Sequence, residues 1–494
     1  MIFSYKLSVG PTCAVTAVDL IREEGFDCEE HIVHTTDGYI LVLHRITVPK
    51  DDPQQHDIST HSLSSRRKHL ASTLNLDTTT TTSINRRSLL GIKHQSTHFI
   101  ASKEPTTIPF TTSNLEIQLP PVLCIHGLMM SSDAFVISGK DSLAFELARS
   151  GYDVWLGNLR GNRYTSHDKY SSTSQEFWDF SLDQFARFDI PAMIEYILQQ
   201  IHLKGQQYRL SLVGFSQGSA ASFAALVSVP NLQSSIACFA ALAPAIALKG
   251  ISHEGFASLL HIDPNFLFLL FGKKSFLPLV LDIQKILSPT AFVFCLDVCM
   301  SFLFGWKCNM INKEKLYTAL VGMTSVTNIV HFMEIVRSNS FTTKQRHHNH
   351  SQHFVPLKYD IKRVQVPLAL FYGSQDSLID VPRLVRSLPT FSRAEKITGR
   401  AGDVLYQQQI GGALTVVNRQ EDKEEGKEKV LPLRRSVTST TLSTSTLPQE
   451  KLVMYERHPL LLFEVPECEH LDIIWSTKRD LVFTALIQFL NKHS

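Results

Sequence analysis

Apolar runs too short to be buried helices recur along the chain, and segments with a helical period of apolar positions separate them. Such short runs are typical of strands that are buried on both faces of a sheet. The alternation of the two kinds of segment predicts a mostly parallel sheet flanked by helices. The predicted strands are 39–46, 122–126, 152–156, 210–215, 237–242, 368–372 and 460–465, and the predicted helices include 141–149, 182–201, 219–228 and 478–491.

The stretch from about 246 to 337 breaks this alternation. Its apolar runs at 266–271, 276–277, 291–294 and 302–306 are rich in Phe and Leu, and its charges are sparse. It falls between two predicted strands, so we expect a mostly helical cap over 246–355 that sits on the sheet. Two interpretations stay open: a subdomain with its own buried core, or a lid over an apolar tunnel.

Three segments have compositions that cannot bury enough apolar surface to offset the entropy of ordering. They are about 50–114, about 342–353 and about 392–450, and we interpret them as flexible insertions on surface loops. The sheet domain is therefore expected to comprise 1–245 and 356–494, interrupted by two of these insertions and by the cap. The middle segment holds four histidines, but no nearby Cys or carboxylate completes a metal-ligand set, so we expect no metal there.

Charge and cysteine content exclude several classes of protein. The 494 residues carry a net charge of +2, which gives no global field to attract nucleic acid. The eight cysteines are scattered, which predicts neither a disulfide scaffold nor a zinc site. One bridge among Cys295, Cys299 and Cys308 stays open. The first residues lack the apolar core of an export signal, and no long uncharged stretch predicts a spanning helix, so we expect an intracellular protein.

The motif Gly214-Phe215-Ser216-Gln217-Gly218 stands between a predicted buried strand and a helix rich in small residues. A serine hydroxyl is a weak nucleophile that must be presented where a base can reach it. A sharp strand-to-helix turn does this, and the glycines permit its strained backbone. We therefore predict that Ser216 is a nucleophile and that Gly214 and Gly218 form its elbow.

Two backbone N–H groups are predicted to form an oxyanion hole. One belongs to Gln217, the residue after the nucleophile, and the other to Leu128, in the loop after the strand 122–126. His126 lies just before this loop. It precedes the elbow in the chain, so we expect it to be structural rather than the general base.

The acid and the base of such a site follow the serine in the order Asp, His. Asp376 follows the predicted strand 368–372, and Asp380 is a competing acid four residues on. We favour Asp376 because it is nearer the strand end. His470 follows the last predicted strand. These positions suit a triad in which His470 takes the serine proton and Asp376 orients the imidazole ring.

With these motifs in place, the chain resembles the acid lipase family, which includes gastric and lysosomal lipases and fungal steryl ester hydrolases. The blocks at 155–162 (Trp-Leu-Gly-Asn-Leu-Arg-Gly-Asn) and 177–181 (Phe-Trp-Asp-Phe-Ser) are the most specific part of the resemblance. Further matching stretches are 24–26, 34–39, 126–128, 151–154, 214–218 and 470–472.

The resemblance implies an α/β-hydrolase fold that cleaves acylglycerols or steryl esters through an acyl-enzyme, without cofactor or metal. The family's catalytic residues map by motif onto Ser216, Asp376 and His470, and its oxyanion donors onto Leu128 and Gln217. The elbow, the missing export signal and the long insertions look more like the fungal steryl ester hydrolases, which work inside the cell at lipid droplets or membranes.

We therefore expect a steryl ester hydrolase that is not secreted, with its apolar segment 266–306 in contact with a lipid droplet or membrane. The exposed-prone Phe and Leu of that segment flank Lys273 and Lys274, which could reach lipid headgroups. The alternatives are a triacylglycerol lipase, an acyltransferase and a non-catalytic lipid-binding relative. No nucleic-acid partner is expected, and the sequence identifies no protein partner.

Overall fold

The computed structural model describes 15–47, 120–202, 208–249, 286–304, 312–320, 322–344, 356–388 and 460–494, with strands at 394–398, 405–410 and 413–418 and short pieces between 266 and 310. The insertion at about 50–114 and the histidines at 347, 348, 350 and 353 lie outside the described residues. Of the second insertion, about 342–353, the structure describes 342–344. None of the described helices is long and apolar enough to span a bilayer.

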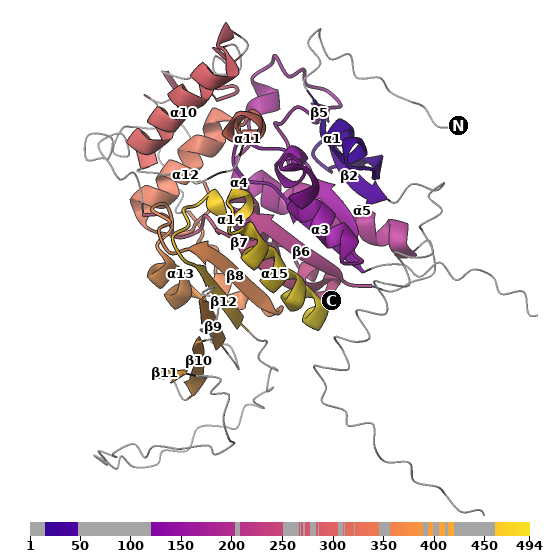
Figure 1. Ribbon diagram of the computed structural model, residues 1–494. Coiled ribbons are helices and arrows are strands. Elements are labelled where there is room, and N and C mark those ends of the chain that lie inside the picture. Colours follow the sequence, from indigo (N-terminus) through magenta and orange to yellow (C-terminus); the bar gives the residue numbers. More distant parts are fainter. Residues whose placement is uncertain are drawn as a thin grey trace, which may run out of the picture. The chain divides into compact units, whose positions relative to one another are not determined.

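The core is a mostly parallel sheet, as predicted, whose strands run in the order β1-β2-β4-β3-β6-β7-β8-β12-β9 (Figure 1). β2 is antiparallel to β1 and β4, and all pairs from β4 to β9 are parallel. The short β5 (Ser166–His167) pairs with β2 at one end. The strands are β1 (Asp27–His34), β2 (Tyr39–Thr47), β3 (Pro121–Ile125), β4 (Asp153–Gly157), β6 (Leu210–Phe215), β7 (Ile236–Leu242), β8 (Leu368–Gly373), β9 (Ala394–Thr398) and β12 (Leu460–Val465).

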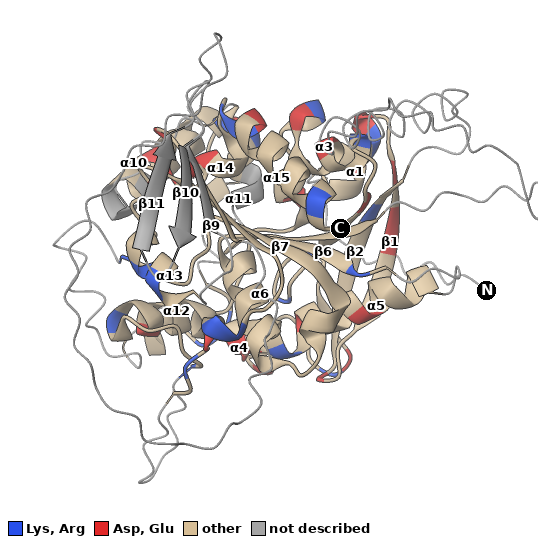
Figure 2. Ribbon diagram, turned by 90° about the horizontal axis from the view of Figure 1, so that it is seen from below, with Lys and Arg blue, Asp and Glu red and all other residues tan. Residues whose placement is uncertain are grey.

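Helices cover both faces of the sheet (Figure 2). One face carries α1 (Ala17–Glu23), α3 (Leu143–Arg149) and α15 (Arg479–His493), and the other carries α5 (Ile190–His202) and α6 (Gln217–Ser228). Every residue of β3, β6, β7 and β8 is buried, which explains why their sequences are continuous apolar runs. The central strands thus form a buried base, and the residues predicted to be catalytic follow the ends of these strands and of β12.

The seven predicted strands are confirmed, each within one residue of its observed bounds. The predicted helix 182–201 is built from three pieces, α4 (Leu182–Gln184), a π-helical turn (Phe185–Asp189) and α5. The strand β1 was not predicted, because it lies at the sheet edge and five of its eight residues are exposed.

The interpretation of 392–450 as an insertion without structure is wrong for its first part. There β9 pairs in parallel with β12 as the outermost strand of the sheet. A hairpin of β10 (Leu405–Ile410) and β11 (Ala413–Asn418) follows. The sequence of β9, Ala-Glu-Lys-Ile-Thr, is neither a continuous apolar run nor a strict alternation of apolar and polar residues, so it carries no strand signal. The residues from 419 to 459 lie outside the described part.

The predicted cap contains α10 (Pro289–Phe304), α11 (Lys313–Leu320) and α12 (Val326–Ser338), so its described part is mostly helical. The first residues after β7 are part of the core instead: Leu248 is buried and bridges to Ile379. In the cap, Cys295 and Cys299 are free thiols, and Cys308 lies outside the described residues.

Candidate active site

The elbow at Ser216 joins β6 to α6 through a backbone conformation that L-residues rarely adopt. Ser216 has φ 52° and ψ −112°, and its N–H donates to the carbonyl of Leu242 over 2.9 Å. A Cβ atom at Gly218 would lie 2.2 Å from the carbonyl oxygen of Ile125, and one at Gly214 would lie 2.7 Å from the backbone of Ser219. Both positions therefore require glycine, as the motif predicts.

Ser216, His470 and Asp376 are brought together at the carboxyl ends of three parallel strands. Ser216 Oγ lies 2.8 Å from His470 Nε2, and His470 Nδ1 lies 2.9 Å from Asp376 Oδ2. All three residues are buried, with Ser216 7% exposed and the other two less. With Asp376 ionised, His470 Nδ1 donates to it, which leaves Nε2 free to accept the serine proton. The arrangement can therefore activate a hydroxyl for attack on an acyl carbon.

The structure distinguishes the two candidate acids. Asp376 Oδ1 accepts from the backbone N–H groups of Leu378 and Ile379 at 2.9 and 3.2 Å, so its carboxylate is fixed with Oδ2 toward the ring. Asp380 instead caps α13 (Val381–Ser387), where its Oδ1 accepts from Arg383 N–H over 3.0 Å. Of the two acids, Asp376 is the one whose carboxylate is hydrogen-bonded to His470.

The two predicted oxyanion donors are Gln217, at the start of α6, and Leu128, in the turn after β3. Gln217 is the first residue of α6, so its N–H is one of those that have no partner within the helix. Leu128 lies in the turn after β3, next to Met129, which has φ 56°. Within the described part of the chain, neither backbone N–H donates to another residue. Both groups are thus available to bind an oxyanion.

His126 is structural, as expected. Its Nε2 accepts from the backbone N–H of Leu159 over 3.1 Å, so the ring proton is on Nδ1, which donates to the carbonyl of Gly127 over 2.9 Å. Burial lowers the pKa of His126 to about 4, which keeps the ring neutral. The imidazole therefore joins the turn after β3 to the chain after β4.

Arg160, from the sequence block that carries the resemblance, forms a buried ion cluster. Its guanidinium donates to Asp189 Oδ1 over 2.6 Å and to Asp37 Oδ2 over 2.6 Å, and it stacks 3.8 Å from the centre of the Tyr39 ring. Burial alone would lower the pKa of Arg160, but the two carboxylates raise it above its usual value. The cluster ties the loop after β4 to the π-helical turn, which ends at Asp189.

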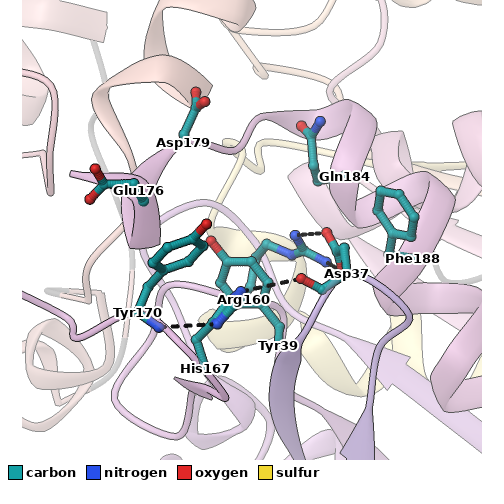
Figure 3. A pocket seen from close by; sticks show the side chains of 9 residues that line it. All are labelled: Asp37, Tyr39, Arg160, His167, Tyr170, Glu176, Asp179, Gln184 and Phe188. Carbon is teal, nitrogen blue, oxygen red and sulfur yellow. Dashed lines mark hydrogen bonds and ion pairs between the residues drawn. The ribbon is translucent and has the colours of Figure 1, made fainter. Parts of the chain in front are cut away.

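A cavity of about 290 Å³ opens beside this cluster, and Figure 3 shows its lining. The triad does not line it. Its polar side chains are already partly paired with one another, so we assign the cavity no chemical role. The lining residues are Asp37, Tyr39, Arg160, His167, Tyr170, Glu176, Asp179, Gln184 and Phe188.

One contact of the site could not be predicted from the sequence. Asn328 of α12 donates from Nδ2 to the side-chain Oε1 of Gln217 over 2.7 Å. A single Asn in a helical segment carries no sequence signal for such a contact. Among the described residues, no group of three or more His, Cys, Asp and Glu side chains is placed to hold a metal ion.

Two family models match the chain. The model of the alpha/beta hydrolase fold covers 120–278, and that of a partial alpha/beta-hydrolase lipase region covers 17–72. The first match spans the turn of Leu128 and the elbow of Ser216, and it agrees with the fold described above.

Known lipases are similar to this chain over most of its length. A probable lipase of Schizosaccharomyces pombe is 34% identical over 381 residues, which cover 75% of this chain and 68% of that protein. The gastric triacylglycerol lipase of Rattus norvegicus is 34% identical and covers 55% of this chain and 71% of its own. The lysosomal acid lipase/cholesteryl ester hydrolase of Macaca fascicularis is 29% identical, and the match covers 76% of this chain and 81% of that protein.

Proposed function

Since the chain belongs to the lipase family of α/β-hydrolases, and is thus a carboxylic ester hydrolase, we propose that it cleaves steryl esters at a lipid surface. The observation that carries the chemistry is the hydrogen-bonded series from Ser216 Oγ through His470 to Asp376. In this proposal the three residues are nucleophile, general base and orienting acid.

The reaction follows from this geometry. His470 Nε2 takes the proton as Ser216 Oγ attacks the ester carbonyl, and the N–H groups of Leu128 and Gln217 bind the oxyanion. His470 then gives the proton to the sterol oxygen as it leaves, and a fatty acyl-enzyme remains. His470 takes a proton from a water molecule as that water attacks the acyl carbon. The bond to Ser216 Oγ then breaks, His470 returns the proton to Oγ, and the fatty acid is released.

The preference for steryl esters over triacylglycerols is supported by the extent of similarity. The relative named as a cholesteryl ester hydrolase matches 76% of this chain, against 55% for the triacylglycerol lipase. The second candidate, a triacylglycerol lipase with the same catalytic residues, is favoured by the higher identity of that shorter match, 34%.

An exposed apolar surface on the cap supports contact with a lipid droplet or membrane. Phe294 and Val298 of α10 are 69% and 50% exposed, and they share one face of that helix. Ile286, just before α10, is 81% exposed. Figure 1 shows α10 at the periphery of the molecule, away from the sheet. Exposed apolar side chains gathered in this way mark an interaction surface, and an ester stored in a lipid phase must be drawn from that phase.

The proposal is tested with wild type and Ser216→Ala on cholesteryl oleate, triolein and p-nitrophenyl butyrate. We expect wild type to cleave cholesteryl oleate faster than triolein. The Ser216→Ala variant should stay folded, and its kcat should fall by roughly 10⁴-fold or more. Faster cleavage of triolein would select the second candidate. An acyl ester formed with an added alcohol, in place of free fatty acid, would identify an acyltransferase.

A further inference from the structure

One turn of the cap, residues 322–328, touches both sides of the candidate oxyanion hole. At its start, the N–H of Gly322 donates to the carbonyl of Met129 over 2.7 Å. A Cβ atom at Gly322 would lie 2.6 Å from that same oxygen, so only glycine allows this approach. Met129 directly follows Leu128. Gly322 therefore holds the backbone next to the Leu128 N–H, which is one of the two candidate oxyanion donors.

At its other end, the turn holds the second donor through a side chain. Asn328 Nδ2 donates to Gln217 Oε1 over 2.7 Å and to Thr324 Oγ1 over 3.1 Å. Asn328 is completely buried, and Gln217 is 3% exposed. Asn328 Oδ1 has no partner within the described part of the chain. The orientation of this amide is therefore set by the two hydrogen bonds that Nδ2 donates.

The turn is itself anchored to the sheet domain. Ser325 Oγ donates to the carbonyl of Phe180, just before α4, over 2.5 Å and accepts from the N–H of Asn328 over 2.9 Å. Asn328 is therefore placed by a serine that is fixed to the core rather than by the cap alone. Three separate parts of the core thus meet one short piece of the cap.

From these contacts we propose that Asn328 is a positioning residue, which orients Gln217 so that its backbone N–H faces the developing oxyanion. The inference rests on the proposed function, since it requires an oxyanion. Donors of this kind act through their placement, so a small displacement lowers transition-state binding without weakening the ground-state complex. The cap thereby takes part in the chemical step.

The test uses the full chain and p-nitrophenyl butyrate, a soluble ester that needs no lipid surface. The variants are Asn328→Ala, Gln217→Ala and the double variant. Thr327→Ala, which changes the neighbouring residue of the same helix, is the matched control. The readouts are kcat, KM and the inhibition constant of butaneboronic acid, which binds serine hydrolases as a tetrahedral adduct.

We expect Asn328→Ala to lower kcat about tenfold, to weaken boronate inhibition by a similar factor and to leave KM unchanged. Gln217→Ala should do the same, and the double variant should be no worse than the poorer single one, because both remove one interaction. Thr327→Ala should stay within about twofold of wild type, because Thr327 is not one of the residues that make the contacts described above.

A higher KM with unchanged kcat would overturn the proposal, since the turn would then only shape the substrate site. Additive losses in the double variant, or kcat within twofold of wild type in both single variants, would also overturn it. If Asn328→Ala does not fold, Gln217→Ala decides alone by the same criteria. Wild-type turnover that Ser216→Ala abolishes tests the proposed function, so the two failures are distinguishable.

Discussion

At the scale of single residues, Asp376 and Asp380 show how two like side chains on one short loop come to differ in function. The carboxylate of Asp376 is oriented by two backbone N–H groups and faces His470. The carboxylate of Asp380 caps the N-terminus of α13. Neither role depends on the residue type alone, because Asp is suited to both. The difference is set by which backbone N–H groups each carboxylate meets.

Replacing each acid should therefore separate activity from stability. Asp376→Asn should lower kcat by about 10⁴-fold, because the amide no longer favours the tautomer of His470 that accepts the serine proton. Asp380→Ala should leave kcat near that of wild type but lower the free energy of unfolding by about 1 kcal/mol, because α13 loses its cap. Kinetics on p-nitrophenyl butyrate and urea unfolding measure the two effects. The opposite pattern would show that the acid had been wrongly assigned.

At the scale of elements, the sequence predicts well wherever burial is complete and poorly where it is partial. The strands that carry Ser216, Asp376 and His470 are apolar runs with a turn motif at their ends, so both the strands and the three residues could be located. β1 and β9 lie at the two edges of the sheet. Five of the eight residues of β1 are exposed, and the sequence of β9 contains Glu, Lys and Thr, so neither strand is a continuous apolar run. Asn328 could not be found because it is a single Asn in a helical segment, with no motif around it to indicate its contact with Gln217.

Two phenylalanines of α10 give a matched test of the proposed lipid contact. Phe294 is 69% exposed, whereas Phe292, two residues away, is 5% exposed. Phe294→Ser should therefore lower binding to phosphatidylcholine vesicles and activity on emulsified cholesteryl oleate several-fold, because less apolar surface enters the lipid. Its activity on p-nitrophenyl butyrate and its melting temperature should not change.

Phe292→Ser is the control, and it should lower the melting temperature and both activities because it empties a packed site. Equal losses on the two substrates in Phe294→Ser would mean that this face packs within the protein. Phe268, which also belongs to the apolar segment, is a poorer probe of lipid contact. It packs against Val326 and Val330 of α12, so its replacement would disturb the cap itself.

At the scale of the whole molecule, the sheet shows which long connection the fold can do without. Ile46, next to the end of β2, is opposite Val154 near the start of β4, and Asp153 at the start of β4 is opposite Pro121 at the start of β3. The two ends of the connection 48–120 therefore emerge at the same edge of the sheet. They are separated by one strand, which is about 10 Å across two strand spacings.

Replacing 50–117 by a six-residue Gly/Ser linker should thus keep the fold and the activity on p-nitrophenyl butyrate. A loop about sevenfold shorter should also stabilise the protein by about 1.7 kcal/mol through loop-closure entropy. Deleting 394–448 should instead destabilise it, because β9 pairs with β12, the strand that leads to His470. Thermal unfolding of both deletions checks this, and an unfolded first variant or an unchanged second one would contradict it.

The backbone of Ser216 has a consequence for how such a protein changes over evolutionary time. At φ 52° and ψ −112° a side chain is strained, by roughly 1–3 kcal/mol for conformations of this kind, and glycine is not. The position that does the chemistry is therefore one where the fold alone would favour glycine. A descendant that kept the fold but no longer hydrolysed esters would gain stability by giving up the serine, so the serine persists only while the reaction is selected.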